Sequence, residues 1–256
     1  MPTWDADLYL KFGRERTQPA IDLVSRISVE NPRNIIDLGC GPGNSTAILR
    51  QRWPDAKITG LDSSEAMITQ AAGSDSETDW QLGDIAAWDP EEDFDVIFSN
   101  ATIQWLGDHG TLLTSLTGHL APGGALAIQL PDHYASPLHQ VLLVVSRNPD
   151  WSDSMDSARG ALTYESVLFY YDTLRPLCRE LEIWETEYFH TMEGPEAIVD
   201  YIRGTGLRPF LEALQSDEDR GRFEELVLRG YSNAYPIQKD GSILFPFRRQ
   251  FIVGYK

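Results

Sequence analysis

Apolar and polar residues alternate in two different patterns along the first 130 residues of the chain. Short apolar runs, each ended by a polar residue, alternate with segments whose apolar residues recur three or four positions apart. The first pattern is typical of buried strands and the second of amphipathic helices. It predicts strands at 35–37, 56–62, 79–85, 94–100 and 123–130, with helices between them. Strands that alternate with helices indicate an α/β doubly wound sheet, whose ligands bind beyond the carboxyl ends of the strands.

The later part of the chain carries longer elements. Two more strands are expected at 181–192 and 242–256, which brings the sheet to seven strands, and helices are expected at 136–147, 194–203 and 216–231. No Pro- or Ser-rich linker separates these helices from the rest of the chain. We therefore expect one domain with a mostly parallel sheet and a helical cap inserted around the late strands.

The boundaries expected within this single domain, residues 1–256, follow from the same patterns. They are an N-terminal lid and helix at 1–30, a ligand-binding core at 31–130, a helical cap at 131–175 and 193–240, and the last strands at 178–192 and 242–256.

Two helix starts carry recognisable signals. In the first helix, Thr17 is expected as the N-cap, and Pro19 is expected in the first turn. In the second, Asn44 or Ser45 is expected to cap a helix that begins at Thr46. This second helix follows a glycine-rich loop, so the positive end of its dipole would face whatever the loop binds.

The composition narrows the class of protein. Hydrophobic residues make up 42% of the chain, enough for a sizeable core, and 39 acidic against 21 basic side chains give a net charge of −18. Because nucleic acids are bound mainly through Lys and Arg, this balance argues against them as partners. No apolar run approaches the roughly 20 residues of a membrane span, and the N-terminus does not read as a secretory signal. With only Cys40 and Cys178, we expect a reduced, cytoplasmic protein without a membrane partner.

The loop after the first strand is rich in glycine. Gly39, Gly41 and Gly43 alternate with other residues behind Asp37, and Asn44 stands where the dinucleotide fingerprint G-x-G-x-x-G requires glycine. Glycines permit a tight turn and let a ligand approach the backbone. The loop therefore predicts a ligand site that departs from the dinucleotide pattern.

Polar residues also end the next three strands. Asp62 ends the second strand, where a carboxylate can accept both hydroxyls of a ribose. Asp84 follows the third strand, where it can meet an exocyclic amine, and Asn100 closes the fourth. Together with the glycine loop, this arrangement resembles motifs I, II and III of the class I S-adenosylmethionine-dependent methyltransferases over residues 30–130. For Asp62 and Asp84, helix capping or plain solvation is the alternative.

The resemblance implies a Rossmann-like fold, S-adenosylmethionine as cofactor and S-adenosylhomocysteine as its product. The glycine loop and Asp37 would approach the methionine part of the cofactor, Asp62 the ribose and Asp84 the adenine. The cofactor-binding residues that it implies in these motifs are Asp37, Gly39, Gly41, Asp62, Ser63, Met67, Asp84, Ile85, Asn100, Ala101 and Trp105.

The N-terminal segment is a candidate lid over the cofactor. Trp4, Tyr9, Phe12 and Arg14 precede the first helix, and aromatic faces attract a sulfonium cation. Tyr9 and Arg14 are therefore counted with the cofactor-binding residues. The alternative is that the aromatic residues only attach a terminal helix to the core.

The residues after the fourth strand indicate the kind of atom that would be methylated. The segment SNATIQW at 99–105 lacks the Asn-Pro-Pro-Tyr that methyltransferases of base amino groups often carry there. The five histidines are scattered without metal-ligand spacing, so no metal is expected. A carboxylate acceptor, with a pKa around 4, is already ionised at neutral pH. We therefore expect no catalytic general base, only groups that orient a carboxylate.

Arginines of the cap and of the last strand are candidates for that orientation. The planar fork of arginine binds a carboxylate through two parallel hydrogen bonds, which suits Arg203, Arg208 and Arg248. Arg208 precedes Pro209, so it is expected in an extended corner with its side chain directed inward. His133, after the fifth strand, is a further candidate donor. The alternative is that the arginines pair with surface carboxylates.

Stretches outside the cofactor motifs sharpen the resemblance. The segments at 4–24, 99–109, 128–139, 201–214 and 244–256 resemble those of the carboxylate O-methyltransferases that act on trans-aconitate. This implies methylation of one carboxylate of that small tricarboxylate, which gives a monomethyl ester. The alternatives are another small acid or a hydroxyl acceptor, a non-catalytic S-adenosylmethionine-binding regulator, and an NAD-linked dehydrogenase, against which Asn44 argues. The sequence does not indicate the oligomeric state, the breadth of acids accepted or which carboxylate is esterified.

Overall fold

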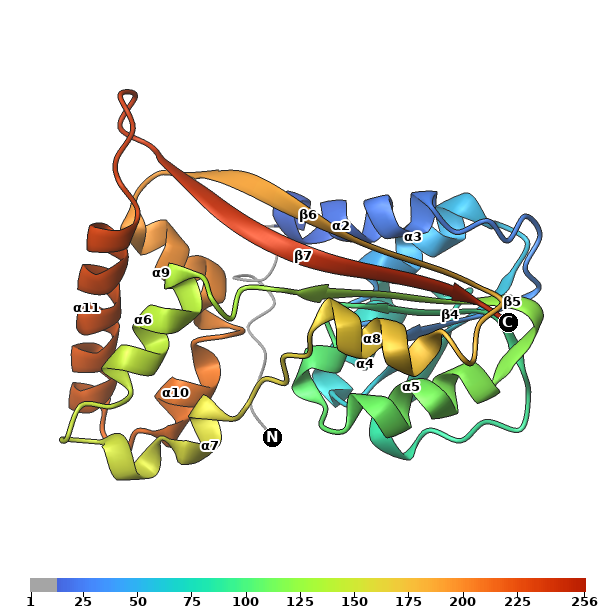
Figure 1. Cartoon of the computed structure of the whole chain (residues 1–256), viewed down its shortest axis with the longest axis horizontal. Helices are drawn as coiled ribbons and strands as arrows, with labels where there is room; N and C mark the ends of the chain where they lie inside the picture. Colours follow the sequence, from blue (N-terminus) through green and yellow to red (C-terminus); the bar gives the residue numbers. More distant parts are fainter. Residues whose placement is uncertain (1–12) are drawn as a thin grey trace.

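A seven-stranded sheet with the strand order β3-β2-β1-β4-β5-β7-β6 forms the centre of the molecule (Figure 1). The structure, a computed structural model, describes residues 13–256 apart from the side chain of Arg14. Its strands are β1 (Asn34–Leu38), β2 (Lys57–Asp62), β3 (Asp79–Leu82), β4 (Phe94–Asn100), β5 (Leu120–Pro131), β6 (Glu180–Met192) and β7 (Ile243–Tyr255). Only β7 runs antiparallel to its neighbours β5 and β6, and the other paired strands are parallel. The predicted α/β class and mostly parallel seven-stranded sheet are confirmed.

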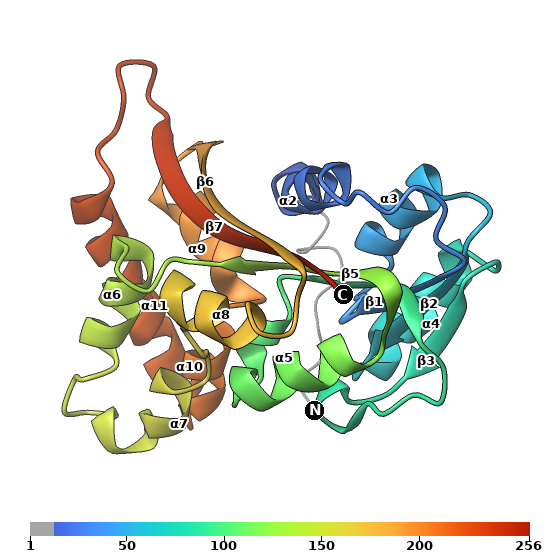
Figure 2. The same cartoon turned by 45° about the vertical axis from the view of Figure 1, so that its right-hand side comes forward.

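Different helices cover the two faces of the sheet (Figure 2). On one face lie α2 (Gly13–Ser25) and α3 (Asn44–Arg52), and on the other lie α5 (His109–Gly118) and α8 (Val167–Leu174). Successive side chains of a strand point to opposite faces, so Ile35 packs under α2 and α3 while Ile36 packs under α5 and α8. The remaining helix of this part, α4 (Glu65–Ser74), packs against β2 and β3.

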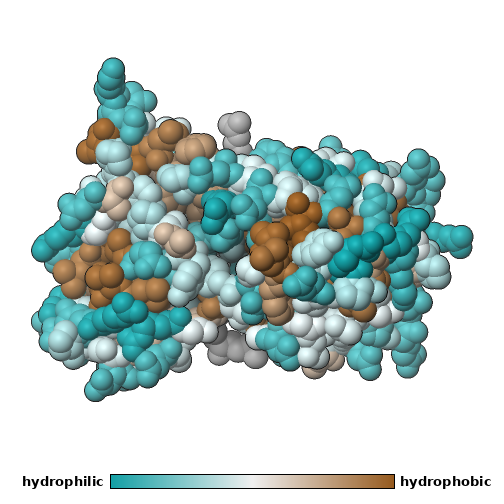
Figure 3. Space-filling view, viewed as in Figure 1, coloured by the Kyte–Doolittle hydropathy of each residue, from teal (hydrophilic) through white to brown (hydrophobic). Residues whose placement is uncertain are grey.

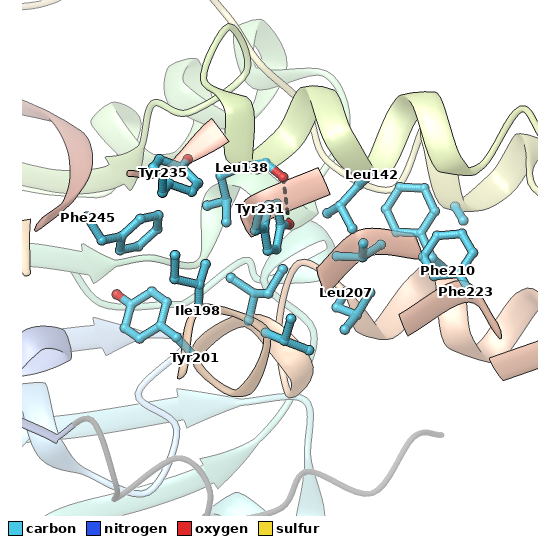
Figure 4. Close-up of a cluster of buried hydrophobic side chains, with 14 of the residues drawn as sticks. Leu138, Leu142, Ile198, Tyr201, Leu207, Phe210, Phe223, Tyr231, Tyr235 and Phe245 are labelled. Carbon is cyan, nitrogen blue, oxygen red and sulfur yellow. Dashed lines mark hydrogen bonds between the residues drawn. The ribbon is translucent and has the colours of Figure 1, made fainter. Parts of the chain in front are cut away.

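The other helices gather beyond the carboxyl end of β5 and form a cap at one end of the sheet (Figures 1 and 2). They are α6 (Pro137–Val145), α7 (Asp156–Arg159), α9 (Pro195–Arg203), α10 (Arg208–Ala213) and α11 (Asp217–Ala234). The cap has a hydrophobic core of its own, in which the rings of Phe210 and Phe223 stack and the Tyr231 hydroxyl donates to the Leu138 carbonyl at 2.8 Å (Figure 4). Phe245 and Phe247 of β7 belong to the same core, so the last strand joins the cap to the sheet.

The two last strands are longer than the rest of the sheet requires. β6 and β7 pair along all 13 residues of each strand, whereas β5 pairs only with the part of β7 that begins at Arg249. Residues 243–248 and their partners in β6 therefore extend as a two-stranded arm beside the cap (Figure 1). The chain passes from the sheet into the cap twice, after β5 and after β6. It returns first along the segment after α7 and then along β7. The segment after α7 leads to α8, which lies inside the range predicted for the cap but packs on α5 and β6.

The two predicted helix starts are wrong by a few residues. Thr17 lies inside α2, because this helix already includes Gly13, and Pro19 is an interior residue rather than a first-turn residue. α3 begins at Asn44, and the residue before it, Gly43, has φ 92° and no capping side chain. Asn44, one of the two predicted caps, is already part of α3, and the hydroxyl of the other, Ser45, donates to Asp37.

Apolar side chains reach the surface in several regions of the face in Figure 3. They lie over α8, where Leu168 and Tyr171 are exposed, over α6, where Val144 is exposed, and on the arm, where Phe189 and Leu244 are exposed. Within residues 13–256, none of the helices combines the length and the apolar character needed to cross a bilayer.

Candidate functional site

A cavity of about 510 Å³ lies at the carboxyl ends of the parallel strands, between the sheet and the cap. This is where a doubly wound sheet is expected to bind its ligand. Most of the residues predicted for the cofactor line it: Gly39, Gly41, Asp62, Ser63, Met67, Asp84, Ile85, Asn100, Ala101 and Trp105. The predicted lid residues Trp4, Tyr9 and Phe12 and the side chain of Arg14 lie outside the described part of the chain.

The glycine loop presents its backbone to this cavity. Gly39 and Gly41 have φ values of 75° and 55°, a left-handed conformation that glycine adopts without strain. A Cβ on Gly39 would lie 2.1 Å from the Thr102 side chain, so the loop can pack there only with glycine. A Cβ on Gly41 would meet no atom within 4 Å. The open space at Gly41 fits the close approach of a ligand to the loop.

The carboxylates of Asp62 and Asp84 lie on the cavity wall and also hold local backbone. Asp62 accepts hydrogen bonds from the amides of Gly41 at 2.9 Å and Ser64 at 2.8 Å. Asp84 accepts from the amide of Ala86 at 2.9 Å and caps the short helix η1 (Ile85–Ala87). A carboxylate has about four lone-pair sites, so these bonds leave acceptor capacity for ligand hydroxyls or amines. The capping role and the ligand role are therefore compatible.

Asp37, the remaining residue predicted for the cofactor, is not brought to the cavity wall. It is fully buried, and its Oδ2 accepts hydrogen bonds from the hydroxyls of Ser45 at 2.7 Å and Thr46 at 2.6 Å. Burial raises the pKa of Asp37 to about 6 against the lowering effect of these hydrogen bonds. Because Ser45 and Thr46 belong to the first turn of α3, Asp37 ties this helix to the end of β1 behind the glycine loop.

The end of β4 offers an unused acceptor. Asn100 Oδ1 is buried and has no hydrogen-bond partner among the described residues. Ala101 has φ 54°, a strained conformation for a residue with a Cβ, and its amide donates a hydrogen bond to the Gln129 carbonyl at 2.8 Å, which holds it in place. The Gln104 side chain donates to the Ala101 carbonyl at 2.7 Å. Such a fixed, strained segment with an unpartnered acceptor fits a ligand that carries a donor group.

Arg208 also lines the cavity, although its backbone conformation is not the one predicted. The residue is the first of α10 rather than part of an extended corner, and Pro209 lies in the first turn, where its missing N–H is not needed. The guanidinium lies 5.6 Å from the centre of the Trp105 ring, and its Nε is 3.7 Å from Glu212 Oε1. Thr205 and Gly206, from the turn before α10, line the cavity beside it.

The structure does not bring Arg203 and Arg248 to the cavity. Arg203 forms an ion pair with Glu224 and lies 3.8 Å from Asp200. Arg248 is half exposed and contacts Asp132 at 2.8 Å. Both arginines pair with carboxylates outside the cavity, which is the alternative that the sequence had left open.

Two other arginines line the cavity, and the sequence reasoning missed both. Arg249 is only 5% exposed, and its Nη2 donates to the Tyr201 hydroxyl at 3.2 Å. Its guanidinium lies 4.3 Å from the centre of the Phe247 ring. Alternation along β7 could have identified it, because Arg249 shares the buried face of Phe245 and Phe247.

Arg16 is the second of these arginines, and it reaches the cavity from α2. Its Nη2 donates to the Tyr201 carbonyl at 2.8 Å, and its guanidinium lies 5.3 Å from the centre of the Tyr201 ring. Helical spacing could have identified it, because Arg16 precedes the buried Ala20 and Leu23 by four and seven positions.

His133 lines the cavity, as its predicted role requires. Its ring is almost fully buried, and its Nε2 lies 3.0 Å from the Tyr164 hydroxyl. Burial, with smaller contributions from the nearby His139 and Arg249, lowers the pKa of His133 to about 3. The imidazole is therefore neutral at physiological pH and can act as a hydrogen-bond donor without carrying charge.

The two ends of the cavity differ in charge. Carboxylates of Asp62 and Asp84 lie with the glycine loop, and guanidinium groups of Arg16, Arg208 and Arg249 lie toward the cap. One end is therefore suited to hydroxyl and amine groups and the other to an anion. In residues 13–256, no cluster of three or more His, Cys, Asp or Glu is arranged to hold a metal ion.

Comparisons with known proteins agree with this geometry. A family model described as a methyltransferase domain matches residues 12–181. The fold is also that of the YcgJ protein from Bacillus subtilis, whose crystal structure gives a TM-score of 0.60 at 14% identity over 93% of this chain and 98% of that one. The chain belongs to the methyltransferase-domain family.

Similarity over the full length narrows the family. The chain is 45% identical over 256 residues to the trans-aconitate 2-methyltransferase of Azoarcus sp., covering 100% of both chains. It is 44% identical over 259 residues to the trans-aconitate 2-methyltransferase of Methylobacterium radiotolerans, covering 100% of this chain and 99% of that one. Within the methyltransferases, its place is therefore in the trans-aconitate 2-methyltransferase family, and the resemblance found in the sequence is confirmed.

Proposed function

We propose that this protein transfers the methyl group of S-adenosylmethionine to one carboxylate of trans-aconitate. The products are the monomethyl ester and S-adenosylhomocysteine. The names of the full-length relatives support this substrate, and the division of the cavity into a carboxylate end and an arginine end supports the pairing of this cofactor with an anionic acceptor.

The carboxylate end fits the cofactor. Asp62 would accept hydrogen bonds from the ribose hydroxyls, and Asp84 would accept one from the adenine amine. The open space at Gly41 would admit the methionine part, and the unpartnered Asn100 Oδ1 is suited to the ammonium group. When bound, S-adenosylmethionine supplies an electrophilic methyl group on a sulfonium.

The environment of Arg249 is the observation that carries the proposal for the acceptor. Its guanidinium is buried on the cavity wall, and no carboxylate of residues 13–256 lies within ion-pair distance of it. A buried charge is costly unless an opposite charge compensates it. A substrate carboxylate would supply that charge, and Arg16 and Arg208 lie on the same cavity for the other carboxylates of a tricarboxylate.

A carboxylate acceptor explains how the transfer can proceed without a general base. A carboxylate is ionised at neutral pH, so no proton has to be removed from it. One of its oxygens forms the new O–CH3 bond while the S–CH3 bond breaks, and the bonding pair stays on sulfur. The protein's part is to fix the acceptor in line with the methyl group, and orientation alone can account for a large share of a rate enhancement.

The proposal is tested by incubating purified protein with S-adenosylmethionine and a panel of mono-, di- and tricarboxylic acids. Mass spectrometry would detect methyl esters and the release of S-adenosylhomocysteine. We expect trans-aconitate to be methylated fastest, and acids with a single carboxylate to react slowly. Binding of S-adenosylmethionine without ester formation from any acid would overturn the proposal and favour a regulator, and faster methylation of another acid would replace the substrate.

A further inference from the structure

Contacts of the neighbouring backbone place Tyr164 next to the arginine end of the cavity, where the acceptor is proposed to bind. It lies in the segment between α7 and α8, which joins the cap to the core. The amide of Thr163 donates to the Gln104 carbonyl at 2.8 Å, so this segment is fixed to η2 (Ile103–Trp105). The Tyr164 ring meets the His133 ring edge to face with centroids 5.6 Å apart, and its hydroxyl lies 3.0 Å from His133 Nε2.

The bond to Tyr164 engages only one nitrogen of His133. The other nitrogen, Nδ1, is buried and has no hydrogen-bond partner in the described part of the chain. A neutral imidazole has one N–H donor and one bare acceptor nitrogen, and the partner of one nitrogen decides the role of the other. A tyrosine hydroxyl can donate or accept, so two tautomers are compatible with the heavy atoms.

The charge expected in the cavity distinguishes the two tautomers. If His133 donated to Tyr164 through Nε2, its Nδ1 would carry a lone pair, which would repel the oxygen lone pairs of a bound carboxylate. If Tyr164 donates to Nε2, then Nδ1 carries the hydrogen and can donate to that carboxylate. Burial also raises the pKa of Tyr164 above its usual range, so the hydroxyl keeps the proton that it donates.

We propose that Tyr164 is a positioning residue that holds His133 in the Nδ1–H tautomer, and that this N–H donates a hydrogen bond to a carboxylate of the acceptor. The inference rests on the proposed function for the nature of the acceptor. It assigns the acceptor site a neutral donor beside the cationic Arg249. It also assigns a role to a residue that does not line the cavity.

The tautomer can be measured without any turnover. In protein labelled with 15N-histidine, the 15N shifts distinguish the protonated ring nitrogen from the bare one, and the His133→Gln spectrum assigns the signals. We expect Nδ1–H at His133 in the cofactor-free protein. Tyr164→Phe should introduce a population with Nε2–H, whereas Tyr134→Phe should not. Tyr134 is the matched control, because its ring packs on that of Tyr164 at 5.0 Å without a bond to His133.

Kinetics test the use of this N–H. Tyr164→Phe should weaken the hydrogen bond from His133 Nδ1–H to the substrate carboxylate. Because hydrogen bonds to charged groups contribute more than neutral ones, the KM for trans-aconitate should rise by about tenfold. The Kd for S-adenosylmethionine should stay unchanged, and Tyr134→Phe should alter neither constant. His133→Asn places an amide near the Nδ1 position and should keep most of the activity. His133→Gln places its amide near the Nε2 position and should not.

The outcomes separate this inference from the proposed function. Nε2–H at His133 in a protein that methylates trans-aconitate normally would overturn the inference alone. Equal losses in His133→Asn and His133→Gln, both folded by circular dichroism, would also overturn it. Failure of the unaltered protein to methylate trans-aconitate would overturn the proposed function, and with it the use made of the N–H.

Discussion

Arg248 and Arg249 are neighbours in the chain, yet one contacts surface carboxylates and the other faces the cavity. We expect Arg249→Met to raise the KM for trans-aconitate by about 10- to 100-fold, since hydrogen bonds between charged groups are lost. Folding stability should not fall, because the substitution removes a buried charge that has no carboxylate partner within residues 13–256. Steady-state kinetics at saturating S-adenosylmethionine and urea unfolding measure the two effects.

The matched control for that prediction is Arg248→Met. It breaks an exposed ion pair, which contributes at most about 1 kcal/mol, and it should leave the KM within about twofold. Arg203→Ala should likewise leave the KM nearly unchanged, because Arg203 pairs with Glu224 outside the cavity. Equal effects on KM from Arg248→Met and Arg249→Met would show that the register assigned to β7 is wrong.

Asp62 allows a separate test of the carboxylate end of the cavity, where the cofactor is proposed to bind. Asp62→Asn keeps the size of the side chain but replaces one acceptor oxygen by a donor, so we expect the Kd for S-adenosylmethionine to rise about tenfold. The KM for trans-aconitate at saturating cofactor should stay within about twofold. Isothermal titration calorimetry gives the first value, with Asp79→Asn at the start of β3 as a control. An unchanged Kd in Asp62→Asn would mean that this carboxylate serves only the loop.

Single residues at strand ends were more predictable than arginines of the cap. The carboxyl ends of parallel strands meet at one edge, so Asp62, Asp84 and Asn100 could be placed together from the sequence alone. The choice between Arg248 and Arg249 depends on which face of β7 meets the cap. The pairing of Arg203 depends on how α9 packs against α11, and no local pattern contains that information.

At the scale of elements, the turn from β1 into α3 tolerates little substitution. Gly39→Ala places a Cβ in a left-handed conformation and 2.1 Å from Thr102, whereas Gly41→Ala imposes only the conformation. A left-handed residue with a Cβ costs about 1–2 kcal/mol. We expect Gly41→Ala to lose about that much of the free energy of unfolding and Gly39→Ala to lose more. Urea denaturation monitored by circular dichroism would reveal the order, and a reversed order would contradict this account of the loop.

The element boundaries show why pattern alone fell short. Thr17 was a plausible cap, but the burial of Ala20 and Leu23 against the sheet supports a helix that includes an interior proline. Ser45 near the start of α3 was one of the predicted caps, yet its hydroxyl donates to the buried Asp37 carboxylate of β1 instead. In both cases a contact distant in sequence decided the outcome.

At the scale of the whole molecule, buried titratable groups make stability depend on pH. Burial lowers the pKa of His133 to about 3 and those of His139 and His190 to about 4. Such groups take up protons on unfolding, so the stability present at neutral pH is lost as pH falls from about 6.5 toward 4. Asp37, with its raised pKa, acts in the opposite sense between 3.8 and about 6.

We expect the protein to be markedly less stable at pH 5 than at pH 7. Near pH 5, the unfolded chain holds about three more protons on these histidines and about one fewer on Asp37, a net of about two. Stability should therefore fall by about 2.7 kcal/mol per pH unit there. Urea unfolding at a series of pH values measures the slope. His139→Leu should reduce the number of protons taken up on unfolding by about one, and the slope should fall in proportion. Equal stability at pH 5 and pH 7 would contradict the burial of these rings as neutral groups.

The position of β7 has a consequence for the order in which the molecule can be completed. β7 follows every other strand along the sequence, yet it lies between β5 and β6 and contributes Phe245 and Phe247 to the cap. During synthesis, β5 and β6 therefore have no common partner until residues 243–255 have been made. The same residues carry Arg249, so the acceptor site forms only when the last strand enters the sheet. Methyl transfer would therefore appear during refolding only after β7 has entered the sheet.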